Sequence, residues 1–315
     1  MNNYLKGKDM KLEIQKEIII DAKVDKVFNL VSDFKHWNTW SPWRIMEPNA
    51  FNEISDDGRK NSWAGELVGM GTMVKTSEVP NIEIFFDLKF LKPFKSKAKC
   101  YFKFSELNLD QTKVTWVMDS SIPFFLFFMK KMMTAMIGMD YERGLKLLKY
   151  VAEKGHVQSK ISCDGVVEGA GFPYVGIESR CSLDEIGADM ESNFRDLMEL
   201  AKNHPNIESE TCFSLYHKFD IVKKNCHYTA GLKYIGKLEV SSEFTKGELG
   251  SSKALKVSHL GAYHHLGNAW SLWYSVIRNK KLKENKSLDP IEFYRNDPRQ
   301  VSVLDIKTDI YLPIK

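Results

Sequence analysis

The sequence predicts an α+β protein with two domains, and three observations lead to this prediction. The chain has 315 residues, which is enough for two hydrophobic cores. Its first half combines many short strand patterns with two helical patterns, and its second half repeats one strand–helix–strand–strand pattern. Runs of strands with few helices are typical of antiparallel sheets that carry their helices on one face.

The first half begins with a strand pattern at 12–20 and an amphipathic helix at 24–34, followed by an expected tryptophan-rich turn at 36–44. Strand-like runs then follow at about 44–54, 62–66, 71–79, 82–91, 97–107 and 112–121. Apolar residues recur at helical spacing over 133–152, and Gly155 ends this pattern. We therefore expect a many-stranded antiparallel sheet closed by a long helix.

The second half contains the same βαββ pattern twice. The first copy is expected at 173–182, 184–203, 211–219 and 226–235, and the second at 253–262, 265–283, 290–296 and 303–314. Tyr216 of the first copy falls at the position of Tyr294 in the second, and Ser214 falls at the position of Glu292. The two copies match, except that one of them carries a carboxylate at this position.

Glu292 lies in a short apolar run that reads as a strand. Side chains alternate along a strand, so Ile291 and Phe293 share one face and Glu292 and Tyr294 the other. We expect the face of Ile291 and Phe293 to be covered by the helix, and the face of Glu292 to line a groove between the two copies. A carboxylate among aromatic side chains has a raised pKa and is stabilised in its ionised form by a cation.

Charge and motif content argue against several classes of protein. With 45 basic and 41 acidic residues the net charge is +4, which does not predict direct nucleic-acid binding. The five cysteines form no C-x-x-C pair, so neither a disulfide framework nor a zinc site is expected. His259, His264 and His265 have no acidic or cysteine partner at ligand spacing. No phosphate loop or dinucleotide motif is present, so we expect no metal and no cofactor.

The apolar stretches predict a cytoplasmic protein without stable membrane insertion. The N-terminus lacks the apolar core of a signal peptide. The longest apolar stretch, 122–139, is interrupted by Lys130 and Lys131 and is short for a membrane span. Its aromatic half could contact a membrane surface, but we expect it to be buried at the entrance of the long helix.

Residues 11–154 resemble the SRPBCC superfamily, in its polyketide cyclase/dehydrase-like branch of the helix-grip (START-like) fold. The residues that carry this resemblance are 18-IIIDAKVDKVFNLVSDFKHWNTWSPW-43, 69-GMGTMV-74, 113-KVTWVM-118 and 139-MDYERGLKLLKYVAE-153. The resemblance implies a curved sheet around the long helix, with an apolar cavity between them. Trp63 and Trp116 could line this cavity or lie outside it. No acid–base pair stands out in this half, so cyclase chemistry is not expected.

Residues 157–315 resemble the GyrI-like, AraC-type effector-binding fold, a SOUL-like βαββ repeat. The resemblance rests on 259-HLGAYHHLGNAW-270, 292-EFYRNDP-298 and 308-TDIYLPI-314. It implies that the two copies pair about a pseudo-twofold axis and leave a groove for aromatic, often cationic, small molecules, which Glu292 reaches. The other expected groove residues are Tyr294, Tyr216, Tyr263, Trp270, Tyr311 and Asp309. Asp309 stands where that family usually has a glutamate.

Together the two resemblances predict a small-molecule-binding protein, a sensor or scavenger of hydrophobic or aromatic compounds, cationic ones included. Two alternatives remain open at this point. The first is a hydrolase acting on reactive small molecules, with Glu292 as general base and Tyr294 as acid. The second is a transcriptional co-regulator that binds a partner protein. The sequence does not decide whether the protein is an enzyme.

Overall fold

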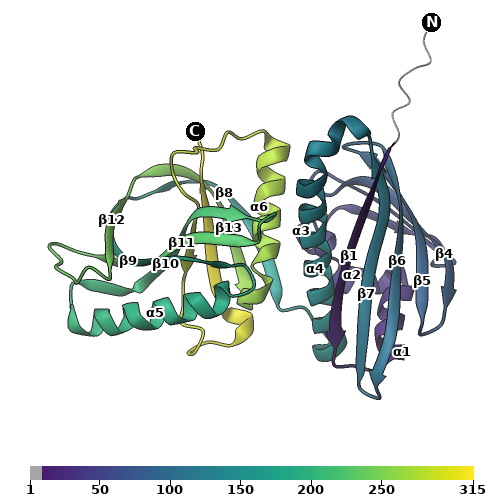
Figure 1. Ribbon diagram of the computed structural model, residues 1–315, viewed down its shortest axis with the longest axis horizontal. Helices are drawn as coiled ribbons and strands as arrows, with labels where there is room; N and C mark the ends of the chain where they lie inside the picture. The colour runs from purple at the N-terminus through teal and green to yellow at the C-terminus, as the bar shows by residue number, and fades with distance from the viewer. Residues whose placement is uncertain (1–8) are drawn as a thin grey trace, which may run out of the picture. The chain divides into compact units, whose positions relative to one another are not determined.

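The computed structural model describes residues 9–315 and has the predicted α+β architecture (Figure 1). The chain divides into two compact units, the first ending at Val157 and the second beginning at Gln158. Each unit contains one antiparallel sheet with its own helices and its own hydrophobic core.

The first unit is a seven-stranded sheet with a long helix along one face (Figure 1). Its elements are β1 (Met10–Ile20), α1 (Val24–Ser32), α2 (Phe34–Trp40), α3 (Pro42–Met46), β2 (Phe51–Ile54), β3 (Lys60–Gly65), β4 (Gly69–Val79), β5 (Glu83–Lys92), β6 (Ser96–Asn108), β7 (Gln111–Ile122), η1 (Phe124–Met129) and α4 (Lys130–Lys154). The strand order is β1-β7-β6-β5-β4-β3-β2. Gly155 ends α4 in the left-handed conformation, with φ of 80°, as the sequence predicts.

The tryptophan-rich segment is helical, so the prediction of a turn at 36–44 is wrong. Trp37 and Trp40 are three residues apart and lie on one side of α2, and Trp43 follows in α3 after the extended residue Ser41. The Asp33 side chain caps the start of α2, and Pro42 occupies the first position of α3. The strand expected at 44–54 is shorter for the same reason, because its first residues belong to α3.

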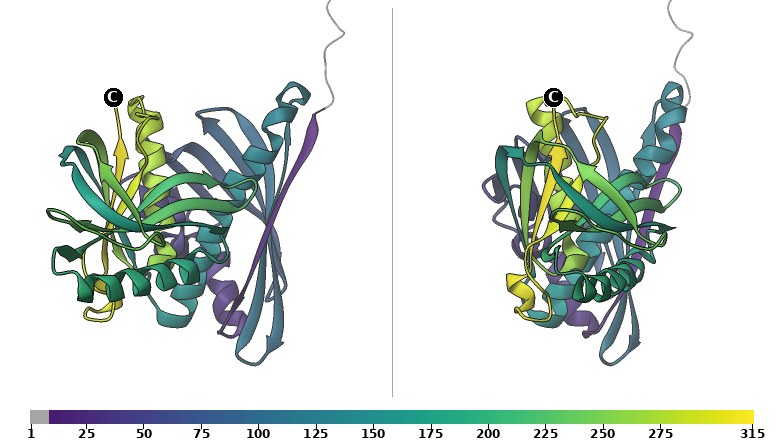
Figure 2. Two further views of the ribbon diagram at one scale, coloured as in Figure 1. Left: turned by 60° about the vertical axis from the view of Figure 1, so that its left-hand side comes forward. Right: turned by 90° about the vertical axis from the view of Figure 1, so that its left-hand side faces the viewer.

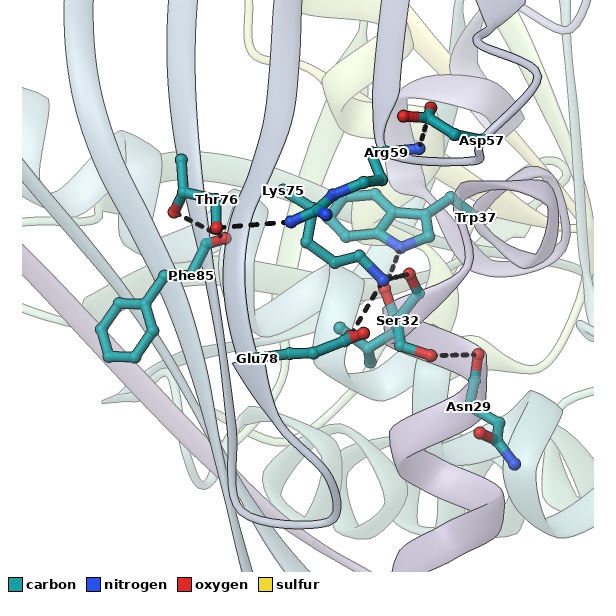
Figure 3. A network of polar contacts seen from close by, with 10 residues as sticks. Asn29, Ser32, Trp37, Asp57, Arg59, Lys75, Thr76, Glu78 and Phe85 are labelled. Atoms are coloured by element: carbon teal, nitrogen blue, oxygen red, sulfur yellow. Dashed lines mark hydrogen bonds and ion pairs between the residues drawn. The ribbon is translucent and has the colours of Figure 1, made fainter.

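The last three carbonyls of α1 accept hydrogen bonds from side chains outside the helix, and Figure 3 shows the bonds from Trp37 and Lys75. The bonds are Trp40 Nε1 to the Leu30 oxygen (2.9 Å), Trp37 Nε1 to the Val31 oxygen (2.8 Å) and Lys75 Nζ to the Ser32 oxygen (3.2 Å). Such carbonyls have no partner within the helix, and a positive charge there also interacts favourably with the helix dipole. Two indoles and one lysine of β4 therefore fix the end of α1.

Aromatic rings fill the space between the sheet and α4 at the level of Trp116. This ring is 1% exposed and stacks between Phe102 and Tyr141, with centroid distances of 4.7 and 3.9 Å. Its indole nitrogen donates to Cys100 Sγ at 2.9 Å. A Cβ on Gly144 of α4 would lie 2.6 Å from the same ring, so the close approach of α4 requires glycine there. Trp116 thus lies inside the unit, and the apolar cavity remains a prediction.

The aromatic half of segment 122–139 is exposed, so its expected burial is wrong. Phe124, Phe125, Phe127 and Phe128 are between 59% and 71% exposed. They belong to η1, which follows the last residue of β7 and therefore lies beyond the end of the sheet and its core. In the part of the chain that the structure describes, no helix is long and apolar enough to cross a membrane.

The second unit is one eight-stranded sheet in which the predicted repeat is visible. Its elements are β8 (Ser159–Gly169), β9 (Phe172–Ser182), α5 (Ile186–Asn203), β10 (Ile207–Asp220), β11 (Asn225–Tyr234), β12 (Thr245–Leu249), β13 (Ser252–Gly261), η2 (Tyr263–His265), α6 (Gly267–Lys280), β14 (Ile291–Tyr294), η3 (Val303–Asp305) and β15 (Lys307–Pro313). The strand order is β12-β9-β11-β10-β14-β15-β13-β8. Figure 2 shows α5 running across the strands on one side of this sheet. The sequence did not predict the edge strands β8 and β12.

The two copies of the repeat meet where β10 pairs with β14. Ser214 lies directly opposite Glu292 in this ladder, and these two residues are equivalent in the repeat. A local twofold axis therefore passes between them. Tyr216 and Tyr294 each lie two residues further along, on opposite sides of the axis, and the Tyr216 N–H bonds the Pro290 carbonyl at 2.9 Å.

The two units should fold independently, because each has a complete core of its own. We expect residues 1–157 and 158–315, expressed as separate proteins, each to unfold cooperatively in urea. Circular dichroism at increasing urea concentration measures this. If neither fragment shows a cooperative transition while the whole chain does, the units are not independent domains.

Replacing Trp40 by phenylalanine should lower the stability of the first unit by about 1–3 kcal/mol, because it leaves the Leu30 carbonyl without a partner. The matched control is Trp43→Phe, since the Trp43 indole makes no hydrogen bond to a helix carbonyl within the described residues. Urea unfolding of residues 1–157 measures both variants. An equal loss of stability in the two would show that the carbonyl bond contributes nothing.

Candidate ligand-binding site around Glu292

Glu292 is a buried carboxylate that accepts three hydrogen bonds. Its side chain lies in β14, and the residue is 2% exposed. Its Oε2 accepts from the hydroxyls of Tyr216 at 2.8 Å and Tyr294 at 2.9 Å, and its Oε1 accepts from the indole nitrogen of Trp270. The two tyrosines that are equivalent in the repeat therefore converge on one oxygen atom of the residue at the axis.

This carboxylate lies on the helix-covered face of the sheet, so the predicted assignment of the two faces is reversed. Trp270 belongs to α6, and Phe194 of α5 packs edge-on against Tyr294 at 5.4 Å. Ile291 and Phe293 lie on the opposite face, in a cluster with Phe213. The apolar character of Ile291 and Phe293 did not show which face the helices cover, because the face away from the helices is also apolar.

The electrostatics of the site leave Glu292 without a counter-charge. Burial raises its pKa above the usual 4.5, and the hydrogen bonds from Trp270, Tyr216 and Tyr294 only partly offset this. Burial, followed by the charge of Glu292, raises the pKa of both tyrosines well above 10. No lysine, arginine or histidine among residues 9–315 forms an ion pair with Glu292. The site therefore supplies donors to the carboxylate but no positive charge.

The apolar side chains around Glu292 keep accessible surface. Only Leu197 of α5 is buried, whereas the other apolar residues on its inner side, Ile186, Met190, Phe194 and Met198, remain partly exposed. Trp270 and Tyr294 are also partly exposed. Tyr263, which is 36% exposed, packs edge-on against Tyr294 at 5.6 Å. Met190, Phe194 and Tyr263 thus contact the Glu292 cluster through Tyr294 while each keeps some accessible surface.

Asp309 and Tyr311, both predicted for the groove, lie on the other face of the sheet. Asp309 pairs across the ladder with Phe293, and period two therefore places it on the face of Phe293. It accepts from Arg295 Nε at 2.7 Å and lies 3.3 Å from Lys256 Nζ. Tyr311 packs against Phe293 and accepts a hydrogen bond from Arg295 at 2.9 Å. The structure brings Tyr216, Tyr263, Trp270 and Tyr294 to Glu292, but not these two residues.

Three residues of the site were not predicted for it. Ser214 is fully buried, with its Oγ 3.0 Å from the Tyr294 hydroxyl. Met190 and Phe194 of α5 contact the same tyrosine, through Sδ at 3.7 Å and through the ring. The repeat already aligned Ser214 with Glu292, and the apolar stripe of α5 already contained the other two.

His259, one of the three histidines considered as metal ligands, pairs with a serine. His259 is fully buried, its Nε2 lies 3.0 Å from Ser159 Oγ, and burial lowers its pKa to about 4. Within residues 9–315, no group of three or more histidine, cysteine, aspartate or glutamate side chains has a geometry that could hold a metal ion.

Two family models match the chain, one for each unit. Residues 11–153 match the family described as polyketide cyclase/dehydrase and lipid transport. Residues 166–315 match the GyrI-like small-molecule-binding domain. The protein is a polyketide cyclase/dehydrase-like domain joined to a GyrI-like domain. Both families bind small molecules, and Glu292 with its three donors lies in the GyrI-like domain.

Solved structures with similar folds include the following three. An EcmrR–DNA complex is 15% identical, with a TM-score of 0.44, over 61% of this chain and 69% of that one. SAV2435 bound to tetraphenylphosphonium is 15% identical, with a TM-score of 0.38, over 48% and 92%. A START superfamily protein from Mycobacterium smegmatis is 19% identical, with a TM-score of 0.34, over 45% and 97%. No curated protein matches the chain.

Glu292→Gln should change how the stability of the GyrI-like domain depends on pH. Because burial raises the pKa of Glu292 in the folded state, the folded protein binds this proton more tightly than the unfolded chain. The wild type should therefore lose stability relative to the variant as pH rises from 4.5 through the folded pKa. The loss amounts to about 1.4 kcal/mol for each unit that separates the two pKa values.

Urea unfolding of both proteins between about pH 4 and pH 8 measures this difference. Glu168→Gln, at an exposed position of β8 in the same sheet, is the control and should follow the wild type at every pH. Stability curves of wild type and Glu292→Gln that run parallel over this range would contradict the prediction.

Proposed function

We propose that the GyrI-like domain binds an aromatic cation on the helix-covered face of its sheet, with Glu292 as the anchor. The protein then acts as a sensor or scavenger of such compounds. The observation that carries this proposal is a buried carboxylate with three hydrogen-bond donors and no counter-charge within the described residues.

A bound cation would supply the positive charge that the protein itself does not place beside Glu292. Burying an unpaired charge is costly, and a ligand cation offsets this cost while favouring the ionised carboxylate. Trp270, Tyr294 and Tyr263 add aromatic surface around the same point. An aromatic face contributes about 0.5–2 kcal/mol to a cation held against it. Charge and aromatic surface therefore favour the same class of ligand.

The state of the two tyrosines favours binding over acid–base catalysis. Tyr216 and Tyr294 each donate a hydrogen bond to Glu292, and their pKa values lie well above 10. A hydroxyl with so high a pKa is a poor proton donor to a leaving group near neutral pH. The tyrosines thus act as fixed donors that hold the carboxylate in place.

Tetraphenylphosphonium tests the proposal, because it is an aromatic cation with a permanent charge. We expect Glu292→Gln to weaken its binding by about tenfold or more, since the substitution keeps the shape of the side chain and removes the charge. The neutral triphenylphosphine oxide should bind both proteins with similar affinity. Isothermal titration calorimetry measures both ligands.

The affinity of the wild type for tetraphenylphosphonium should also rise as the pH rises through the pKa of Glu292. Below that pKa, binding of the cation should release a proton from the Glu292 carboxyl group. The Glu292→Gln variant should lack this pH dependence, and the Glu168→Gln control should keep it. Equal affinities of the wild type and Glu292→Gln for the cation at pH 8 would overturn the role of Glu292.

A further inference from the structure

Two loops of the first unit lie at the same end of its sheet. One is the β5–β6 turn, where Phe90 pairs with Ser96 across the hairpin. The other is η1, which follows Ile122 at the end of β7. Because Ala98 of β6 pairs with Ser120 of β7, the start of β6 is level with the end of β7. The β5–β6 turn and η1 are therefore neighbours, and we call them together the aromatic tip.

The aromatic tip exposes five phenylalanines, each between 59% and 81% exposed: Phe94, Phe124, Phe125, Phe127 and Phe128. A phenylalanine covers about 150–250 Å² when it is fully buried, so the exposed aromatic area is on the order of 500 Å² or more. This reaches the size of the largest apolar patches on typical monomeric proteins, and such patches usually mark a contact with another surface.

The two chain segments that form the aromatic tip carry charges of one sign, and Asp9, beside Ser121 at the start of β1, is an acidic neighbour from another strand. Between Asp87 and Glu106 the chain has six lysines and no acidic residue, and between Asp119 and Asp140 it has two lysines and no acidic residue. The lysines closest to the phenylalanines in sequence are exposed: Lys92, Lys95, Lys97, Lys130 and Lys131. Exposed phenylalanines edged by lysines combine apolar and cationic surface in one place. A protein partner with a purely apolar surface would not explain the lysines.

We propose that the aromatic tip docks reversibly on a membrane surface that carries anionic lipid headgroups. The phenylalanine rings would enter the boundary between headgroups and acyl chains, while the flexible lysine side chains keep their ammonium groups at the phosphates. Anionic headgroups attract each nearby lysine, and salt weakens this attraction. No described helix is suited to cross a membrane, so the contact is peripheral. This surface belongs to the first unit and does not involve Glu292.

Co-sedimentation of the full chain with vesicles tests this inference. We expect binding to vesicles of phosphatidylcholine with about one third phosphatidylglycerol, and more than about tenfold weaker binding to phosphatidylcholine alone. Raising the salt to about 0.5 M should weaken the binding to the anionic vesicles, because it screens the lysines.

Two sets of variants separate the apolar and the electrostatic parts. Phe125→Ser with Phe128→Ser should weaken vesicle binding more than about tenfold. Lys130→Gln with Lys131→Gln should weaken it about tenfold and reduce its dependence on salt. The control pair is Ile82→Ser with Leu109→Ser, which removes two apolar residues that are 56% and 79% exposed and lie in the β4–β5 and β6–β7 turns at the opposite end of the sheet. This pair should bind like the wild type.

All substituted side chains are exposed, so the variants should keep the urea midpoint of the wild type, which confirms that they fold. Wild-type protein that stays in solution with anionic vesicles at low salt would overturn the proposal. So would binding that is equally strong in Phe125→Ser/Phe128→Ser. A wild-type dimer in sedimentation velocity that becomes monomeric in this variant would assign the tip to contact between copies of the chain instead.

Discussion

The ladder between β10 and β14 is the contact on which the second unit depends. In the described part of the chain, the strands of the two repeats join only there. The ladder sets Ser214 against Glu292 and brings the hydroxyls of Tyr216 and Tyr294 to the same carboxylate oxygen. A slip of two residues would carry Tyr216 about 6.6 Å along its strand. Glu292 would then be buried with fewer donors, so the register and the site stabilise each other.

Strand alternation and the internal repeat were sufficient to predict that Glu292, Tyr294 and Tyr216 share one face. They did not show which face the helices cover, because Ile291 and Phe293 pack into an apolar cluster of their own on the far side. The position of Asp309 depends on the pairing of β14 with β15, and the sequence of either strand alone does not determine the register of that pair. A sequence pattern shows which residues of one strand lie on the same face, but it does not show which residues of a neighbouring strand lie on that face.

The other predictions from the sequence that were wrong or incomplete failed for similar reasons. The helices at 34–46 were missed because Asn, Ser and Pro between the tryptophans read as turn residues, although the spacing of Trp37 and Trp40 is helical. The strands β8 and β12 lie at the edges of the sheet, where little apolar surface is buried and the alternation signal is weak. The segment η1 is apolar without being buried. Hydrophobicity predicts a core only where the fold provides something to pack against.

The position of Glu292 beside a local twofold axis has a consequence for how such a site can arise. In a dimer of identical chains, residues beside the axis come in equal pairs, so this position would hold two carboxylates or none. Two carboxylates whose Cβ atoms lie about 4.5–5.5 Å apart would repel each other, and one of them would stay protonated. Here the halves are covalently continuous but differ in sequence, and Ser214 stands where a second glutamate would be. Internal duplication followed by divergence thus allows a single carboxylate residue beside a symmetry axis, whereas a homodimer would place a pair of them there.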